Sequence, residues 1–302
     1  MISKSISINI IGSGSMGHLW TSYLVNKQVD VILYAKQSHP SFELQVQSPQ
    51  DSFCCDISHQ SFNQWRNADF IIICVKATAL ESLCHQLKEI TTKHSPILLM
   101  MNGLGIIEIA EKILPNTLVC QASTSHGAQL NNTQLLHTGS GQTLIGQIDG
   151  TDTNQAIFSP LIEHLNKALP IAIWNNQHLE TLWTKLIVNS IINPLTAIYQ
   201  VTNGALIQDQ HLNQQAANLT QQLDPIIKKY LPQQTWQSLF EKVESIANQT
   251  YTNTSSMRQD ILKGRKTEID FISGYLLNTA EKLNLQLPEH EKIVTTIKRL
   301  EQ

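Results

Sequence analysis

Short apolar runs alternate with helical patterns through the first half of the chain. Runs rich in β-branched residues predict strands, and stretches with apolar residues every three or four positions predict helices after several of them. The predicted strands occupy residues 6–11, 31–34, 69–75, 96–101 and 117–123, and the predicted helices occupy 15–27, 79–91 and 105–113. Because the strands are almost continuously apolar, we expect a parallel, doubly wound sheet covered on both faces.

The pattern changes in the second half. Residues 133–148, TQLLHTGSGQTLIGQI, predict a hairpin around Gly139 and Gly141, followed by a helix at 154–168 and a strand at 171–174. From His178 onward only helical periodicity remains. The chain is therefore predicted to form an α/β domain over residues 1–176 and an all-α domain over residues 177–302.

Composition and charge narrow the class of protein. The chain has 302 residues, 41% of them hydrophobic and 15% charged, which favours a globular protein of two domains. A net charge of -3 provides no overall basic field, which argues against nucleic acid and anionic membranes as partners. No apolar run approaches the roughly 18 residues that span a bilayer, and no signal peptide is recognisable at the N-terminus. We expect a cytoplasmic protein.

The cysteines show no metal-binding spacing. The five are Cys54, Cys55, Cys74, Cys84 and Cys120. An odd set without a CxxC pair favours a reducing compartment and predicts no zinc site and no other metal. The adjacent Cys54 and Cys55 suggest redox chemistry and His126 suggests acid–base chemistry, but unreactive thiols and a structural histidine are the simpler interpretations.

A glycine-rich loop follows the first predicted strand. The segment INIIGSGSMG places Gly12, Gly14 and Gly17 between that strand and the next helix. Such glycines provide a tight turn, a close backbone approach to a pyrophosphate, and close packing of helix on strand. The loop predicts a Rossmann-type dinucleotide-binding domain. Its candidate cofactor contacts are Gly12, Ser13, Gly14, Ser15, Met16 and Gly17.

The end of the second strand indicates which dinucleotide binds. An acidic residue there would bind the ribose 2′-hydroxyl of NAD, but the strand runs into Ala35 and Lys36, and Asp30 precedes it. Because this position offers a lysine and no carboxylate, it favours the 2′-phosphate of NADP(H). The alternative is that Lys36 is an ordinary surface lysine.

Two further polar residues end predicted strands. Lys76 follows the strand at 69–75, and Asn102 follows the strand at 96–101. Ligands of open α/β sheets bind beyond the carboxyl ends of the strands, so both residues are candidate cofactor contacts. Taken singly, each could equally be a solvated charge or a turn-forming amide.

The apolar segment 182–199 carries a polar stripe. Lys185, Asn189 and Asn193 recur four residues apart, which places them along one face of a helix. A buried lysine needs a partner or a shifted pKa, so Lys185 either reaches solvent or serves a site. Pro194 is expected to break or bend this helix.

Two later segments are unusually polar. These are NTSSM at 253–257 and DILKGRKTEIDFISG at 260–274. Ser255 or Ser256 could simply cap the following helix. Glu268 or Asp270 could simply pair with one of the basic residues of the second segment on a solvated face.

Together these segments resemble ketopantoate reductase (2-dehydropantoate 2-reductase), a family of the 6-phosphogluconate dehydrogenase-like superfamily. The matching segments are GSGSMG at 12–17, VKA at 75–77, NGLG at 102–105, SHGA at 125–128, WTKLIVNSIINPLTA at 183–197, NTSSMRQD at 253–260 and GRKTEIDFISG at 264–274. The resemblance covers essentially the whole chain.

The resemblance implies an activity and a set of site residues. The activity is NADPH-dependent reduction of 2-dehydropantoate to (R)-pantoate in pantothenate and coenzyme A biosynthesis, with Lys185 as proton donor and substrate contact. The implied substrate-binding residues are Asn189, Asn193, Asn203, Asn253, Thr254, Ser255 and Ser256. The implied cofactor contacts beyond the glycine loop are Lys36, Lys76, Asn102, Ala128 and Glu268. Because Lys36 stands where the family often has arginine, a weaker NADP preference is expected.

The sequence is compatible with two other functions. One is a related NADP-dependent reductase of another branched 2-keto or 3-hydroxy acid, because fold and polar stripe are shared more widely than substrate choice. The other is a non-catalytic NADP(H)-binding sensor. The sequence is compatible with both a monomer and a homodimer.

Overall fold

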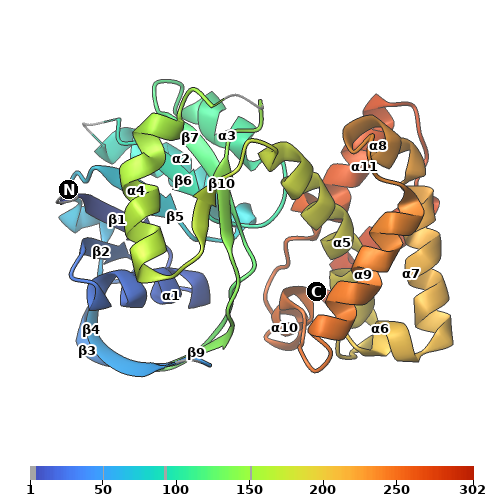
Figure 1. Ribbon diagram of the computed structural model, residues 1–302, viewed down its shortest axis with the longest axis horizontal. Helices are drawn as coiled ribbons and strands as arrows, with labels where there is room; N and C mark the ends of the chain where they lie inside the picture. The colour runs from blue at the N-terminus through green and yellow to red at the C-terminus, as the bar shows by residue number, and fades with distance from the viewer. Residues whose placement is uncertain (1–4, 50, 92–93, 150–151) are drawn as a thin grey trace. The chain divides into compact units, whose positions relative to one another are not determined.

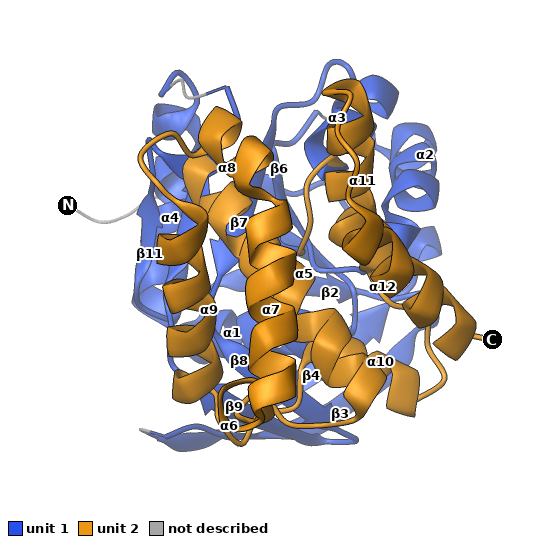
Figure 2. Cartoon of the chain, turned by 90° about the vertical axis from the view of Figure 1, so that its right-hand side faces the viewer, with its two compact units in different colours: residues 1–101, 106–179 blue, residues 102–105, 180–302 orange. Residues whose placement is uncertain are grey.

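The protein divides into two compact units, coloured separately in Figure 2. The structure is a computed structural model that describes residues 5–49, 51–91, 94–149 and 152–302. Unit 1 comprises Met1–Met101 and Ile106–Leu179, and unit 2 comprises Asn102–Gly105 and Glu180–Gln302. The segment 102–105, which lies within the first predicted domain, groups with the helices of unit 2.

Unit 1 is built on a sheet of 11 strands. The strands are β1 (Ser7–Ile11), β2 (Asp30–Tyr34), β3 (His39–Gln47), β4 (Ser52–Gln60), β5 (Phe70–Ile73), β6 (Ile97–Leu99), β7 (Val119–Thr124), β8 (Gly127–Asn131), β9 (Gln134–Gly139), β10 (Thr143–Gly146) and β11 (Ala172–Trp174). The helices are α1 (Ser15–Asn26), α2 (Leu80–Ile90), α3 (Ile106–Ile113) and α4 (Gln155–Ala168). Helix α1 packs beside α4 and α2 beside α3, and the two pairs cover opposite faces of the sheet (Figure 1).

The five predicted strands are parallel, as expected, but additional strands make the sheet as a whole mixed. Its strand order is β11-β10-β7-β6-β5-β1-β2-β4-β3-β9-β8. The stretch from β7 to β4 is parallel, whereas β10 runs antiparallel to β7, β3 to β4, and β8 to β9. The parallel centre has the buried, apolar strands from which a parallel sheet was predicted. The antiparallel strands lie toward the two edges.

The predicted hairpin at 133–148 is wrong. Strand β9 pairs with β8 through a turn at Asn132, whose φ is 53°, and also with β3. Strand β10 instead pairs with β7 and β11, far from β9 in the strand order. Alternating apolar residues identify a strand, but they do not specify its partner, so the two strands were located and wrongly joined.

The β3–β4 hairpin was missed by sequence analysis. Its buried side chains, Leu44, Val46 and Ile57, are separated by exposed polar residues on strands with one solvated face. The core itself lies between the central strands and the helices. Ile8, Ile10 and Leu33 pack with Leu19 and Trp20 of α1 in one apolar cluster.

Unit 2 is entirely helical within the described residues, as predicted. Its helices are α5 (His178–Tyr199, beginning at the junction with unit 1), α6 (Ala205–Gln208), α7 (Gln210–Gln222), α8 (Asp224–Tyr230), α9 (Trp236–Gln249), α10 (Ser256–Leu262), α11 (Ser273–Lys282) and α12 (Pro288–Leu300). Among the helices described here, none is both long and apolar enough to cross a membrane.

Helix α5 is the core helix of unit 2. Leu186, Ile187, Ile191 and Leu195 are all at most 3% exposed, so the helix is covered on several sides. Pro194 does not break it, because α5 continues to Tyr199. The predicted break at that residue is therefore absent, and the alternative, a bend, stays a prediction.

Candidate active site

The glycine loop of unit 1 has the geometry that a pyrophosphate requires. Gly12 has a φ of 117°, and a Cβ there would lie 2.8 Å from the Cys74 carbonyl oxygen. A Cβ on Gly17 would lie 1.8 Å from the Gly12 oxygen, so both glycines are needed for close packing. Gly14, at the start of α1, has no described atom within 4 Å of a built Cβ. The backbone there is open to a ligand, and the first turn of α1 contains no acidic residue.

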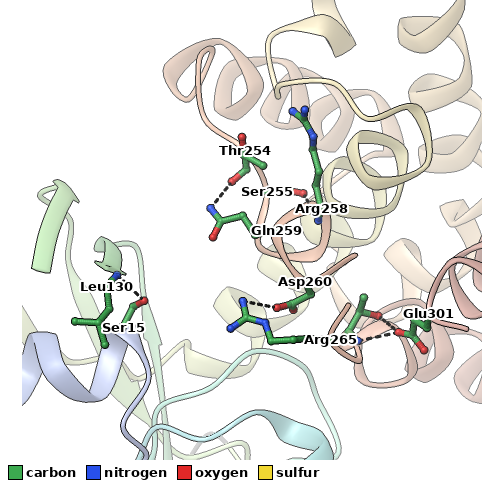
Figure 3. A network of polar contacts seen from close by, with 10 residues as sticks. Ser15, Leu130, Thr254, Ser255, Arg258, Gln259, Asp260, Arg265 and Glu301 are labelled. Atoms are coloured by element: carbon green, nitrogen blue, oxygen red, sulfur yellow. Dashed lines mark hydrogen bonds and ion pairs between the residues drawn. The ribbon is translucent and has the colours of Figure 1, made fainter. Parts of the chain in front are cut away.

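The other residues of the loop lie around this opening. Ser13 is exposed, whereas Ser15 and Met16 are half-buried. The hydroxyl of Ser15 accepts a hydrogen bond of 3.2 Å from the backbone N–H of Leu130 on β8 (Figure 3). This contact ties the loop to the strand that carries Ala128. The loop residues therefore fit a dinucleotide.

Three further cofactor candidates lie on unit 1. Lys36 is exposed two residues after β2, and Lys76 is half-buried just after β5. Ala128 is half-buried on β8 opposite His137. Strands β1, β2 and β5 are adjacent and parallel, so the loop, Lys36 and Lys76 follow the carboxyl ends of neighbouring strands. That edge is where open α/β sheets bind ligands.

Lys185 lies on α5 in unit 2, and although the residue as a whole is half-buried, its amine is buried away from solvent. Burial lowers the pKa of its amine to about 8, while the negative charge of Glu268 acts to raise it. An amine with a pKa in this range can donate or accept a proton near neutral pH far more readily than an ordinary lysine. On the same stripe, Asn189 is half-buried and Asn193 is 7% exposed.

Asn102 and Glu268 belong to the same unit as Lys185. The amide of Asn102 donates a hydrogen bond of 3.4 Å to the carboxylate of Glu268. The segment that carries Asn102 is held by Gly103, whose φ is 99° and which lies against Phe271. Two residues predicted to contact the cofactor are thus hydrogen-bonded to each other, and one of them, Glu268, acts electrostatically on the predicted proton donor.

Asn203 provides a second polar group in unit 2. Its side-chain N–H donates to the hydroxyl of Thr250 at 2.9 Å, and its backbone N–H donates to the carbonyl of Asn253 at 3.0 Å. Its side-chain oxygen is buried and has no hydrogen-bond partner among the described residues. A buried acceptor without a donor is costly, and a hydroxyl of a ligand would satisfy it. Asn253 itself is exposed.

Ser255 connects the NTSSM segment to α5. It is the N-cap of α10, where its hydroxyl accepts from the backbone N–H of Arg258 at 3.1 Å (Figure 3). The hydroxyl of Thr196 on α5 also donates to it at 2.7 Å. The capping interpretation therefore holds for Ser255, which is 6% exposed. Ser256, in the first turn of α10, is exposed, and Thr254 is half-buried and accepts from Gln259 at 3.2 Å.

The charged segment at 260–274 divides into two parts. Arg265 pairs with Asp260 at 3.0 Å, and Asp270 pairs with Lys298 at 2.7 Å. Asp270 thus forms an ion pair on a solvated face, as expected, but its partner Lys298 on α12 lies outside the segment whose basic residues were predicted to pair with it. Glu268 differs, because its charge acts on the buried amine of Lys185.

Sequence analysis missed two residues that position the site. Thr196 holds Ser255, and Thr250 holds Asn203. Thr196 lies three residues beyond Asn193, whereas the four-residue step of the stripe leads to Ala197, so the stripe alone does not point to it. Thr250 belongs to none of the matching segments, and only the fold places it beside Asn203.

Comparisons with known proteins match both halves of the chain to one family. The family Ketopantoate reductase PanE/ApbA matches residues 8–150, and Ketopantoate reductase PanE/ApbA C terminal matches residues 177–301. A 2-dehydropantoate 2-reductase from Vibrio cholerae is 31% identical over 298 residues, covering 98% of each chain.

Two solved structures show the same fold. A ternary structure of D-mandelate dehydrogenase with NADH and anilino(oxo)acetate has a TM-score of 0.86 at 22% identity, covering 98% of each chain. A dimeric ketopantoate reductase from Staphylococcus aureus has a TM-score of 0.81 at 21% identity, covering 98% of this chain and 99% of that one.

The fold and the site define a class of enzyme. A Rossmann-type unit with an open glycine loop, followed by a helical unit with a buried lysine beside a carboxylate, is the arrangement of a nucleotide-dependent oxidoreductase. With both family matches in place, the chain belongs to the ketopantoate reductase family.

Proposed function

We propose that the protein reduces 2-dehydropantoate to (R)-pantoate with NADPH, in the branch of pantothenate synthesis that leads to coenzyme A. The observation that carries this proposal is the buried Lys185 amine, with a pKa of about 8, in the unit that also holds Glu268 and Asn102. The names of the curated relatives support the choice of substrate.

The proton donor in this proposal is Lys185. When bound, a reduced nicotinamide supplies a hydride to C2 of the keto acid. The ammonium of Lys185 stabilises the charge that builds on the C2 oxygen and then protonates that oxygen. Glu268 favours the ammonium form before the reaction, because its carboxylate raises the pKa of the amine. No metal is needed for these steps.

The remaining polar residues orient the substrate. Asn189 and Asn193 present amides along the same helix as Lys185, and Asn203 offers a buried oxygen that a substrate hydroxyl would satisfy. Ser256, exposed at the first turn of α10, is the candidate contact for the substrate carboxylate, with Asn253 and Thr254 beside it. Holding C2 in a fixed position accounts for a large part of catalysis.

The glycine loop, Lys76 and Ala128 are the candidate cofactor contacts of unit 1. Asn102 and Glu268 of unit 2 are candidate cofactor contacts on the family resemblance alone. Lys36 is the candidate contact for the 2′-phosphate, which favours NADP over NAD. Lysine lacks the forked donors of arginine, so we expect a moderate rather than strict preference.

Steady-state kinetics test the proposed function. The purified protein should oxidise NADPH in the presence of 2-dehydropantoate, with a lower kcat/KM for NADH. Cofactor binding without turnover of any keto acid would instead identify a sensor. No binding of either nucleotide would contradict the proposal altogether.

A second candidate is a reductase of another 2-keto acid. The solved D-mandelate dehydrogenase, which shares the fold with a TM-score of 0.86, carries an oxo-acid derivative alongside NADH. Measuring kcat/KM for 2-dehydropantoate beside phenylglyoxylate and unsubstituted branched 2-keto acids separates the two. The pantoate assignment requires 2-dehydropantoate to have the highest value.

We also propose that the protein forms a homodimer, because the solved Staphylococcus aureus relative is described as dimeric. Sedimentation equilibrium over a wide range of protein concentrations gives the mass directly. A monomer mass throughout that range would contradict this part of the proposal.

A further inference from the structure

A pair of histidines lies directly behind the glycine loop. The Nε2 atoms of His18 on α1 and His59 on β4 are 3.0 Å apart, and Nδ1 of His18 is 3.0 Å from the carbonyl oxygen of Gly14. His18 is 2% exposed, whereas His59 is half-buried. A chain of contacts therefore runs from the loop backbone to a partly exposed imidazole.

The hydrogen bonds fix the tautomers of both rings. A carbonyl only accepts, so Nδ1 of His18 carries its proton and donates to Gly14. In neutral His18 the other nitrogen is then an acceptor, so Nε2 of His59 donates to it. The nitrogen of His59 that takes up a further proton is Nδ1. His59 can thus become an imidazolium without losing its bond to His18.

His59 lies where the second strand of the fold ends. It stands opposite Leu33 of β2 and opposite His39 of β3, and the neighbouring Gln60 carbonyl accepts from the N–H of Ala35. Lys36 follows Ala35 directly. In Rossmann-type domains the end of this strand receives the 2′ position of the adenosine ribose. His59 is thus at the same strand end as Lys36.

The surroundings of His59 disfavour a positive charge in the free protein. Burial, followed by the charges of His18 and His39, lowers the pKa of His59 to about 4. The ring of Phe42 stands edge-on to His59, with centroids 5.4 Å apart. Among the described residues, two bases act on His59, namely His18 from α1 and His39 from β3. His59 is therefore neutral in the free protein, and a bound anion would favour its protonation.

We propose that His59, held in place by His18, is a second contact for the 2′-phosphate of NADP(H) beside Lys36, and that it binds this phosphate as an imidazolium. The inference rests on the proposed function, because it assumes a dinucleotide on the glycine loop. A phosphate monoester has a second pKa of about 6 and is largely a dianion at neutral pH. Its negative charge raises the pKa of a neighbouring imidazole, so NADPH binding takes up a proton at His59. The 2′-hydroxyl of NADH has no such effect.

Calorimetry with NADPH and NADH on the full chain tests this inference. Titrations near pH 6 and pH 8, each in two buffers with different ionisation enthalpies, give both Kd and the number of protons taken up. The variant His59→Gln keeps an N–H donor for His18 but has no titrating group. Lys36→Ala serves as a comparison, because lysine stays charged throughout, and His85→Gln on α2 is a matched control with an exposed histidine.

The expected result is a loss confined to NADPH. His59→Gln should remove about one proton of uptake, weaken NADPH binding about tenfold near pH 6 and less near pH 8, and leave the Kd of NADH within about twofold. Lys36→Ala should weaken NADPH binding at both pH values and leave the proton uptake unchanged. Protons released by the phosphate itself are common to wild type and variant, so they cancel in the difference.

Two outcomes overturn the inference. Equal proton uptake by wild type and His59→Gln excludes an imidazolium at the phosphate. If His59→Gln weakens the binding of NADPH and NADH equally, His59 has a structural role only. If NADPH binds and supports turnover in either case, the proposed function stands without this contact. If the wild type binds neither nucleotide, the proposed function itself fails and the inference fails with it.

Discussion

Lys185 illustrates how much chemistry depends on the environment of one residue. A lysine on a solvated helix is a permanent cation, but burial on α5 lowers the pKa of this amine to about 8, and Glu268 limits the decrease. The stripe of Lys185, Asn189 and Asn193 was visible in the sequence as a four-residue spacing. The partnership with Glu268 was not, because periodicity relates residues of one helix and carries no information on contacts between distant segments.

Replacing Lys185 by alanine should remove the proton donor. We expect kcat for 2-dehydropantoate reduction to fall about a hundredfold or more, with a smaller change in the Kd of NADPH. Steady-state kinetics and nucleotide binding measure the two effects. Lys242→Ala, at an exposed position on α9, is the matched control and should leave kcat unchanged. Near-normal kcat in Lys185→Ala would remove Lys185 from the mechanism.

The pH profile should report the same amine. Reduction needs the protonated form, so kcat/KM is expected to decrease as the pH rises through about 8, the pKa of Lys185 in the free protein. Glu268 raises that pKa, so Glu268→Gln should lower it and move the alkaline limb to lower pH. The position of the limb, rather than its height, is the quantity to compare. An unmoved limb would mean that another group controls it.

At the scale of elements, one serine hydroxyl joins two helices of unit 2. Ser255 caps α10 and accepts from Thr196 on α5, so the NTSSM segment is fixed to the helix that carries Lys185. That a serine of this segment could cap a helix was predictable, because serine before an apolar stretch is a common start signal. It could not identify which residue of α5 the serine meets.

A double-mutant cycle measures this connection. Ser255→Ala should lower the free energy of unfolding by about 1–2 kcal/mol, because it removes both a helix cap and a buried hydrogen bond. Thr196→Val keeps the shape and removes the donor, and the two changes together should cost less than their sum. Ser256→Ala is the control. Because this neighbouring hydroxyl is exposed, its removal should change the free energy of unfolding by less than about 0.5 kcal/mol. Strictly additive changes would show that the two hydroxyls are not coupled.

At the scale of the whole molecule, the chain passes between its two units more than once. It leaves unit 1 after Met101, contributes Asn102–Gly105 to unit 2, returns for Ile106–Leu179, and then forms the rest of unit 2. The alternation of strands and helices predicted the α/β and all-α organisation. The strand partners and the grouping of Asn102–Gly105 with unit 2 both depend on contacts between distant segments, which local patterns do not encode.

Gly103 allows the segment Asn102–Gly105 to pack closely against Phe271 of unit 2. It has a φ of 99°, and a Cβ there would lie 2.8 Å from both Cβ and the carbonyl oxygen of Phe271. We expect Gly103→Ala to lower the free energy of unfolding by about 1–3 kcal/mol, measured by urea denaturation. Gly139→Ala is the control, because a built Cβ there has no described atom within 4 Å. Equal stability of the two variants would contradict the close packing of this segment.

The placement of Asn102–Gly105 also limits how the two units can be exchanged between related enzymes. A chimera joined near residue 180 takes Asn102 from one parent and Glu268 from the other, although the two side chains share a hydrogen bond within unit 2. Gly103 and its packing partner Phe271 are separated in the same way. An exchange that preserves the helical unit therefore transplants two pieces of chain, the four-residue segment together with everything from Glu180 onward.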